Sequence, residues 1–215
     1  MVQRDFDFAS MESVQWNYRF HPQSSDGQSR NRNSLPFPAL RGAYQLSNAA
    51  CALTVLECLN NQLPVDIGAI KRGLLLVENP GRFQVLPGRP LVVLDVGHNP
   101  HAARALRRSL INLAFAQKRT AVFSMLSDKD IDGVLEIVKD QFDEWNIAPL
   151  DVPRGMTVEA LQAKLAEHGI DNVNVFETVA AAYRAALAKA TENDRIVVFG
   201  SFHTVADVMA VLKEH

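Results

Sequence analysis

Cysteine is scarce in this sequence, since its 215 residues include only Cys51 and Cys58. Two thiols cannot form a disulfide framework, and a structural zinc site needs four ligands, so they make neither a disulfide-stabilised scaffold nor a metal site by themselves. Both lie on one expected helix. We therefore expect them to be reduced thiols in the core of an intracellular protein.

Excess positive charge and long apolar runs are also absent. The chain has 22 lysines and arginines against 24 aspartates and glutamates, a net charge of −2, with no basic block. This balance disfavours a nucleic acid or an anionic membrane as the partner. No apolar run approaches the roughly 20 residues that span a bilayer, and the opening MVQRDFDFAS lacks the apolar core of a signal peptide. We expect a cytoplasmic protein with a small ligand.

Three glycine motifs are missing as well. None of the 11 glycines belongs to the phosphate-binding loop G-x-x-x-x-G-K-[ST], to the dinucleotide motif G-x-G-x-x-G or to the nucleophile elbow G-x-S-x-G. If this chain handles a nucleotide, it supplies only part of the site.

What is present divides into two segments. Residues 1–40 are polar and rich in turn formers, with one expected strand in VQWNYRF and a hairpin or exposed loop in HPQSSDGQSRNRNS. Helices are expected at 44–60, where Leu46, Ala49, Leu53 and Leu56 recur at helical spacing, and at 65–77. Asn-Pro-Gly at 79–81 ends this segment, because proline cannot continue a helix and restricts the residue before it.

The second segment alternates apolar runs with amphipathic helical patterns. Its expected strands are LVVLDV, TAVFSM, EWNIAPL, VNVF and RIVVFG, and its expected helices are 100–117, 131–141, 158–167, 179–191 and one near the end with Val205, Val208, Met209 and Leu212 on one stripe. Continuous apolar strands between such helices predict a Rossmann-like α/β domain, a mainly parallel sheet with helices on both faces. Ligands bind such sheets beyond the carboxyl ends of the strands.

The stretch LDVGHNPHAA lies at such an end. Asn99 and Pro100 suit the N-cap and first position of a helix and need no other role. Asp95 and His98 are better candidates for ligand binding, because a carboxylate and an imidazole stand there beside a helix N-terminus. A metal site from Asp95, His98 and His101 is an alternative, although a single turn does not guarantee its geometry.

Two further loops follow expected strands in the same way. After TAVFSM, Ser127 and Asp130 have the spacing of a capping box, and Lys129 is a candidate for binding an anionic substrate. After RIVVFG, Ser201 and His203 place a hydroxyl and an imidazole at the carboxyl edge and are candidates for substrate binding. In both loops a purely structural role is equally compatible with the residues.

Five stretches, in the same order, resemble segments of one family. LDVGHNPHAA is similar to the D-x-x-H-N-P-H-A segment of the folylpolyglutamate synthases, members of the Mur ligase superfamily. PGRFQVL resembles their linker between the central and C-terminal domains, and YQLSNAACAL resembles the helix with an ATP-contacting asparagine. SMLSDKDI and VFGSFHTVADVM resemble loops of their C-terminal domain. The combination is typical of the bacterial bifunctional dihydrofolate synthase/folylpolyglutamate synthases, and the resemblance runs from about residue 40 to the end.

The resemblance implies an ATP-dependent carboxylate-amine ligase of folate biosynthesis. Such enzymes phosphorylate dihydropteroate or a tetrahydrofolate polyglutamate with ATP, and the amino group of L-glutamate attacks the acyl phosphate. Residues 1–80 would be the C-terminal remnant of the central ATP-binding domain, and residues 81–215 the Mur ligase C-terminal domain. The phosphate loop, the Mg²⁺ ligands and a modified lysine would lie upstream of Met1, so we assign no metal ligand and expect the fragment alone to be inactive.

Carried over by position, the resemblance makes Asn48, Arg82 and Asp95 contacts to ATP and places His98 beside the reaction centre. His98 and Asp95 are then the candidate catalytic residues. Two other interpretations stay open: a non-catalytic Rossmann-like binding module, and another Mur-type amide ligase. The choice between dihydrofolate synthase, folylpolyglutamate synthase and both is also open.

Overall fold

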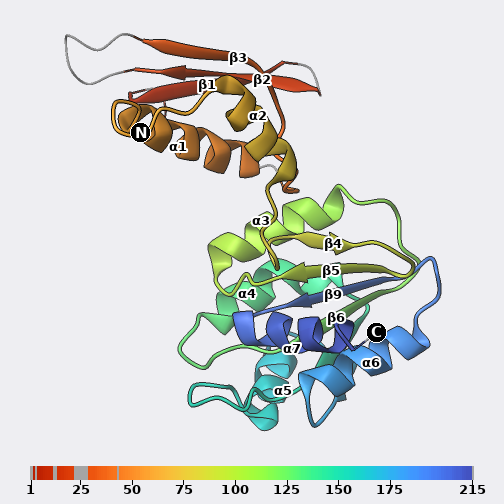
Figure 1. Cartoon of the computed structure of the whole chain (residues 1–215). Coiled ribbons are helices and arrows are strands. Elements are labelled where there is room, and N and C mark those ends of the chain that lie inside the picture. The colour runs from red at the N-terminus through yellow and green to blue at the C-terminus, as the bar shows by residue number, and fades with distance from the viewer. Residues whose placement is uncertain (1, 3, 12–13, 22–28, 43, 215) are drawn as a thin grey trace. The chain divides into compact units, whose positions relative to one another are not determined.

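The computed structural model describes residues 2, 4–11, 14–21, 29–42 and 44–214 (Figure 1). They form two compact units, residues 1–78 and residues 79–215. The division lies beside the Asn-Pro-Gly sequence at which a boundary was expected. Residues 22–28 of the expected hairpin or loop lie outside the described residues. No helix in the described ranges is long and apolar enough to cross a membrane.

The first unit is a three-stranded antiparallel sheet, in the order β1-β2-β3, with two helices packed on it. Its elements are β1 (Phe6–Met11), β2 (Gln15–Phe20), β3 (Arg30–Pro36), α1 (Gln45–Cys58) and α2 (Ile67–Leu76). Trp16, Tyr18 and Leu35 from the sheet are buried against Leu53 of α1 and Leu74 of α2. Both helices and β2 agree with expectation, whereas β1 was not predicted and β3 fell in the expected hairpin or loop.

The two cysteines correct one expectation. Cys51 and Cys58 are exposed rather than part of the core. The buried residues of α1 include Ala50, Leu53 and Glu57, and a helix turns its neighbouring positions away from that stripe. Prediction of the buried stripe was correct, but the thiols lie outside it.

The second unit is a six-stranded sheet with helices on both faces. Its elements are β4 (Gln84–Leu86), β5 (Leu91–Asp95), α3 (Pro100–Ile111), β6 (Arg119–Phe123), α4 (Ile131–Val138), the 3₁₀ turn η1 (Lys139–Gln141), β7 (Glu144–Ile147), α5 (Val158–Glu167), β8 (Val173–Val175), α6 (Val179–Lys189), β9 (Arg195–Phe199) and α7 (Phe202–Leu212). The strand order is β4-β5-β9-β6-β7-β8, with only β4 antiparallel to its neighbour. The predicted mainly parallel α/β fold is confirmed.

Two apolar clusters cover the two faces of this sheet. Residues of α3, α4 and α5 pack with Val93, Phe123 and Val197 on one face. Residues of α6 and α7 pack with Leu94, Val122 and Val198 on the other. Figure 1 shows the blue helices α6 and α7 on the opposite side of the strands from the green helices α3 and α4. Because β5, β6 and β9 are parallel, their carboxyl ends form one edge, and the candidate residues follow those ends.

Candidate active site

Asp95 ends strand β5, and its carboxylate is almost fully buried, with the residue only 6% exposed. One carboxylate oxygen accepts the backbone N–H of Gly97 at 2.7 Å, and the other accepts that of Phe83 at 3.0 Å. Burial raises the pKa of Asp95 above its ordinary 3.8, while those two amides and the charges of Arg82 and His98 act in the opposite direction. Asp95 therefore joins the end of β5 to the segment before β4.

That segment is held on both sides of Arg82. The carbonyl oxygen of Gly81 accepts the N–H of Val96 at 2.7 Å, and the N–H of Gly81 donates to the side-chain oxygen of Gln84 at 3.0 Å. Phe83 is buried in the core and has a positive φ of 45°. A non-glycine residue rarely adopts this conformation unless its surroundings fix it. The backbone around Arg82 is thus attached to β5.

His98 is half-buried at the turn between β5 and α3. Its Nδ1 lies 2.9 Å from the carbonyl oxygen of Val96. A carbonyl only accepts, so Nδ1 carries the proton, and in the neutral ring Nε2 is left as an acceptor. Asn99 caps α3 by accepting the N–H of Ala102 at 2.9 Å, with Pro100 in the first turn. The predicted helix start is confirmed.

Phe202 lies next to both Arg82 and His98, although it was not among the expected site residues. The Arg82 guanidinium carbon lies over the Phe202 ring, 5.6 Å from its centroid. The His98 ring centroid is 6.1 Å from the same ring. We call Arg82, Asp95, His98 and Phe202 the strand-edge cluster. The sequence contained a signal for this position. Phe202 follows an expected strand and the capping residue Ser201, and this order places its aromatic ring at the carboxyl edge of the sheet, where ligands bind.

Ser201 has a structural hydrogen-bonding role. Its hydroxyl accepts the N–H of Thr204 at 2.9 Å as the cap of α7 and lies 2.8 Å from the Thr204 hydroxyl, which donates to the carbonyl of Ser124 at 2.9 Å. Ser201 is only 2% exposed. His203 is exposed on α7, where its charge lowers the pKa of Asp207 against the larger, raising influence of burial. Substrate binding by Ser201 and His203 stays a prediction.

Lys129 lies in the loop after β6, where its ammonium group pairs with Asp128 at 3.2 Å. Asp128 also pairs with Arg154 at 2.6 Å, so the loops after β6 and β7 are joined. The expected capping box is wrong in one respect. Asp130, not Ser127, is the N-cap of α4, accepting the N–H of Gly133 at 2.9 Å, while the Ser127 hydroxyl donates to the carbonyl of Arg154 at 3.3 Å.

Asn48, the remaining candidate, belongs to the first unit. It is exposed in the first turn of α1, and its side-chain amide donates to Gln45 Oε1 at 3.0 Å. Exposed Cys51 and Val55 follow it on the helix at three- and seven-residue spacing. The three form one solvent-facing stripe, which we call the α1 stripe.

The alternative metal site gains no support from the geometry. Among the described residues, no group of three or more His, Cys, Asp or Glu side chains is placed to hold a metal ion. His101 is exposed in the first turn of α3 and forms no such group with Asp95 and His98.

The family model described as Mur ligase, glutamate ligase domain matches residues 81–202. That range is more than half of the chain and contains the strand-edge cluster. The chain therefore belongs to the Mur ligase family.

Similar proteins include folylpolyglutamate synthases that are named with a second, folate-related activity. The chain is 40% identical over 201 residues to the dihydrofolate synthase/folylpolyglutamate synthase of Escherichia coli (strain K12), covering 93% of this chain and 45% of the relative. The solved structure of E. coli FolC in complex with DHPP and ADP is 36% identical with a TM-score of 0.81, covering 99% of this chain and 47% of that one. A bifunctional folylpolyglutamate synthase/dihydrofolate synthase with Mn, AMPPNP and L-glutamate bound is 40% identical with a TM-score of 0.78, covering 98% and 47%. The chain thus spans a little under half the length of these relatives.

Proposed function

We propose that this chain forms the C-terminal part of an ATP-dependent ligase in folate biosynthesis that adds L-glutamate to dihydropteroate, to reduced folates, or to both. The observation that carries the proposal is the convergence of Arg82, Asp95 and His98 at one sheet edge. It occurs in a chain similar to proteins whose solved structures hold ADP, DHPP or L-glutamate. The proposal places the enzyme in the cytoplasm.

In the proposed reaction, the acceptor carboxylate takes the terminal phosphoryl group of ATP and becomes an acyl phosphate, with ADP as the leaving group. The glutamate amino nitrogen then forms the amide bond, and phosphate and one proton leave. Activation is needed because a carboxylate itself resists attack by an amine. ATP supplies the phosphoryl group, and the residues of this chain bind and orient the reactants.

Arg82 would bind the nucleotide phosphates. Within the described part of the chain its guanidinium makes no ion pair with a carboxylate, and it rests on the Phe202 ring instead. Its donors are therefore available for charge-assisted bonds to phosphate oxygens. Asn48, exposed on α1, would contribute a further contact to ATP from the other unit.

Asp95 would act first by fixing the Phe83 and Gly97 amides and, with them, the backbone around Arg82. Each carboxylate oxygen has a second lone pair, so Asp95 can also accept a bond from a ribose hydroxyl. His98 would act through Nε2, the acceptor left free by the Val96 contact. An acceptor there can orient the glutamate amino group or take its proton.

Glutamate carries two carboxylates, and the loops after β6 and β9 would receive them. Lys129 offers an ammonium group that now pairs with the exposed Asp128, an exchangeable partner because exposed ion pairs contribute little. The Ser201 hydroxyl is committed to its cap, so this turn would contribute mainly through the N-terminus of α7, which favours negative charge. His203 is exposed beside it.

The fit of this chain to ATP and to Mg²⁺ differs. Arg82 supplies a cation suited to phosphate, but among the described residues no acidic or imidazole cluster is placed to hold a metal ion. In this proposal the Mg²⁺ ligands belong to a separate ATPase portion, in keeping with the 45% of the E. coli relative that this chain covers. The isolated chain should not catalyse ligation, since phosphoryl transfer depends on that portion for positioning and charge stabilisation.

The test is incorporation of labelled glutamate into dihydropteroate, and separately into tetrahydrofolate, by the protein extended with its N-terminal ATPase portion, with ATP and Mg²⁺. Activity with either acceptor is expected, and His98→Ala should reduce kcat about 10²–10⁴-fold if His98 transfers the proton. Lack of activity with both acceptors, in a protein that binds ATP, would instead support another Mur-type amide ligase or a binding module.

A further inference from the structure

We propose that Phe202 is a positioning residue, an aromatic platform that holds the Arg82 guanidinium and the His98 ring ready for the nucleotide. This inference rests on the proposed function for the identity of the ligand. The contact geometry of the platform stands independently of it.

The Phe202 ring is solvent-facing but fixed at its base. The residue is 55% exposed and is the first of α7. Directly before it, Ser201 accepts the N–H of Thr204, and the Thr204 hydroxyl donates to the carbonyl of Ser124, the residue directly after β6. Gly200 has a φ of 110° and no room for a side chain, because an added Cβ would lie 2.4 Å from the Ser124 carbonyl oxygen. The backbone that carries the ring is therefore held in the parallel sheet.

Arg82 reaches the ring from a backbone that is equally fixed, through the Gly81 and Phe83 hydrogen bonds to the end of β5. Its side chain alone would be free to move, since a long cationic side chain in water has many rotamers. Resting the guanidinium on an aromatic face restricts these rotamers and is worth about 0.5–1 kcal/mol at exposed sites, which corresponds to about two- to fivefold in an equilibrium constant.

The position also explains why an apolar ring is useful at this edge. A carboxylate could also hold the Arg82 guanidinium in place, but it would then compete with the phosphate for the same positive charge. An aromatic face attracts the cation without occupying its N–H donors, which remain available for a ligand. His98 is positioned by two contacts, the Val96 carbonyl at its Nδ1 and the Phe202 ring at 6.1 Å.

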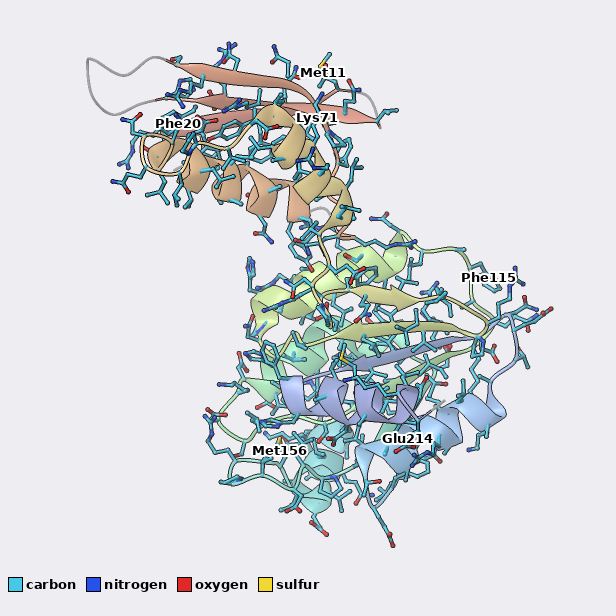
Figure 2. The ribbon with its side chains drawn as sticks, in the orientation of Figure 1. Met11, Phe20, Lys71, Phe115, Met156 and Glu214 are labelled. Carbon is cyan, nitrogen blue, oxygen red and sulfur yellow. The ribbon has the colours of Figure 1, made fainter. Side chains whose placement is uncertain are left out.

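The first experiment tests the Arg82–Phe202 contact in the 215-residue chain itself, by measuring the ¹H–¹⁵N NMR signal of the Arg82 Nε–H group. The signal is assigned by its disappearance in Arg82→Lys. Ring current should shift this signal upfield, Phe202→Leu should remove the shift, and Phe202→Trp should retain it. Phe115→Leu is the matched control. Phe115 is 91% exposed, points away from the second unit in Figure 2 and, among the described residues, makes no ring or cation contact. An unchanged Arg82 signal in Phe202→Leu would overturn the proposal.

The second experiment measures ADP affinity of the N-terminally extended protein by calorimetry, which does not depend on ligation. Phe202→Leu should weaken binding about two- to fivefold, Phe202→Trp should restore it, and Phe115→Leu should leave it unchanged. The Phe202→Leu effect should disappear in an Arg82→Gln background. Persistence of that effect would overturn the platform. No ADP binding by the unsubstituted protein would overturn the nucleotide as the ligand, and with it the proposed function, whereas the contact geometry is tested by the NMR signal. Failure of glutamate incorporation with the ADP results intact would overturn only the proposed function.

Discussion

The Asp95 carboxylate accepts the backbone N–H of Phe83, twelve residues earlier in the chain, at 3.0 Å. The same carboxylate accepts the N–H of Gly97 at 2.7 Å, so one buried side chain connects the segment before β4 with the turn after β5. Arg82 directly precedes Phe83 and His98 directly follows Gly97, so both site candidates are next to residues that Asp95 holds. The relationship makes Asp95 an organiser of the strand-edge cluster as well as a candidate ligand contact.

Asp95→Asn should destabilise the second unit. An amide has only one oxygen, so one of the two backbone donors loses its acceptor, at a cost of about 1–3 kcal/mol in the free energy of unfolding. The measurement is urea unfolding monitored by Trp145 fluorescence in a Trp16→Phe background, because the two tryptophans lie in different units. Unfolding at the same urea concentration as the unsubstituted chain would contradict the structural role.

The pH dependence of this variant gives a separate prediction. Burial raises the pKa of Asp95 above 3.8, so the folded state keeps its proton at pH values where the unfolded state has lost it. This stabilisation is fully present below pH 3.8 and is lost as pH rises through the folded pKa. Relative to Asp95→Asn, the unsubstituted chain should therefore gain stability as pH falls through that range. If the stability difference between the unsubstituted chain and Asp95→Asn became smaller as pH falls, the expected direction of the Asp95 pKa shift would be wrong.

Gly200→Ala should destabilise the second unit more than Gly88→Ala. Both glycines have a positive φ, 110° and 121°, where alanine is strained by about 1–3 kcal/mol. At Gly200 the new Cβ would also lie 2.4 Å from the Ser124 carbonyl oxygen, whereas nothing lies within 4 Å at Gly88. An additional loss of about 1–3 kcal/mol is expected from this overpacking. Equal losses in thermal unfolding would show that the close approach is relieved at no cost.

In the first unit, Arg32→Met should lower stability more than Arg19→Met. Arg32 donates to the buried Glu57 carboxylate at 2.8 Å, and Arg30 pairs with its other oxygen at 3.2 Å. Removing one partner from a buried carboxylate costs about 1–3 kcal/mol or more. Within the part of the chain that the structure describes, Arg19 donates only to the exposed Asn31, so its loss should stay within about 0.5 kcal/mol. Trp16 fluorescence in a Trp145→Phe background reports the unit concerned, and equal losses would refute the expectation.

The α1 stripe should be covered in the N-terminally extended protein. Exposed Cys51 and Val55 beside Asn48 form an apolar surface of the kind that normally packs on a neighbour. Cys51 should react readily with a maleimide in the 215-residue chain and much more slowly in the extended protein. A cysteine introduced by Phe115→Cys should remain reactive in both. Equal Cys51 reactivity in the two proteins would show that the stripe remains open.

Local signals were sufficient for the central part of the α/β unit. The apolar run 91–94 and the Asn99-Pro100 pair predict a buried strand and a capped helix, and both are present. The function of the turn between them stays a prediction. These features depend on neighbouring residues, so a single sequence contains them. Prediction of the two helices of the first unit succeeded for the same reason.

Long-range contacts determine what the sequence did not show. Helix α3 ends at Ile111 rather than near residue 117, and the buried Arg195 donates to the carbonyls of Leu110 and Ala114 at this end. Strand β3 has the polar sequence RNRNSLP and was expected to be hairpin or loop, because its pairing with Glu57 of α1 is not visible in sequence. The Arg82–Phe202 contact joins residues 120 positions apart.

The hydrogen bonds at Gly81, Phe83 and Gln84 make residues 81–84 mechanically part of the second unit. A pivot between the two units would therefore have to lie before this segment, near residue 79, where the division falls. Arg82 therefore belongs to the same unit as Asp95, His98 and Phe202, and the hydrogen bonds and ring contacts within that unit assemble these four side chains before any ligand is bound.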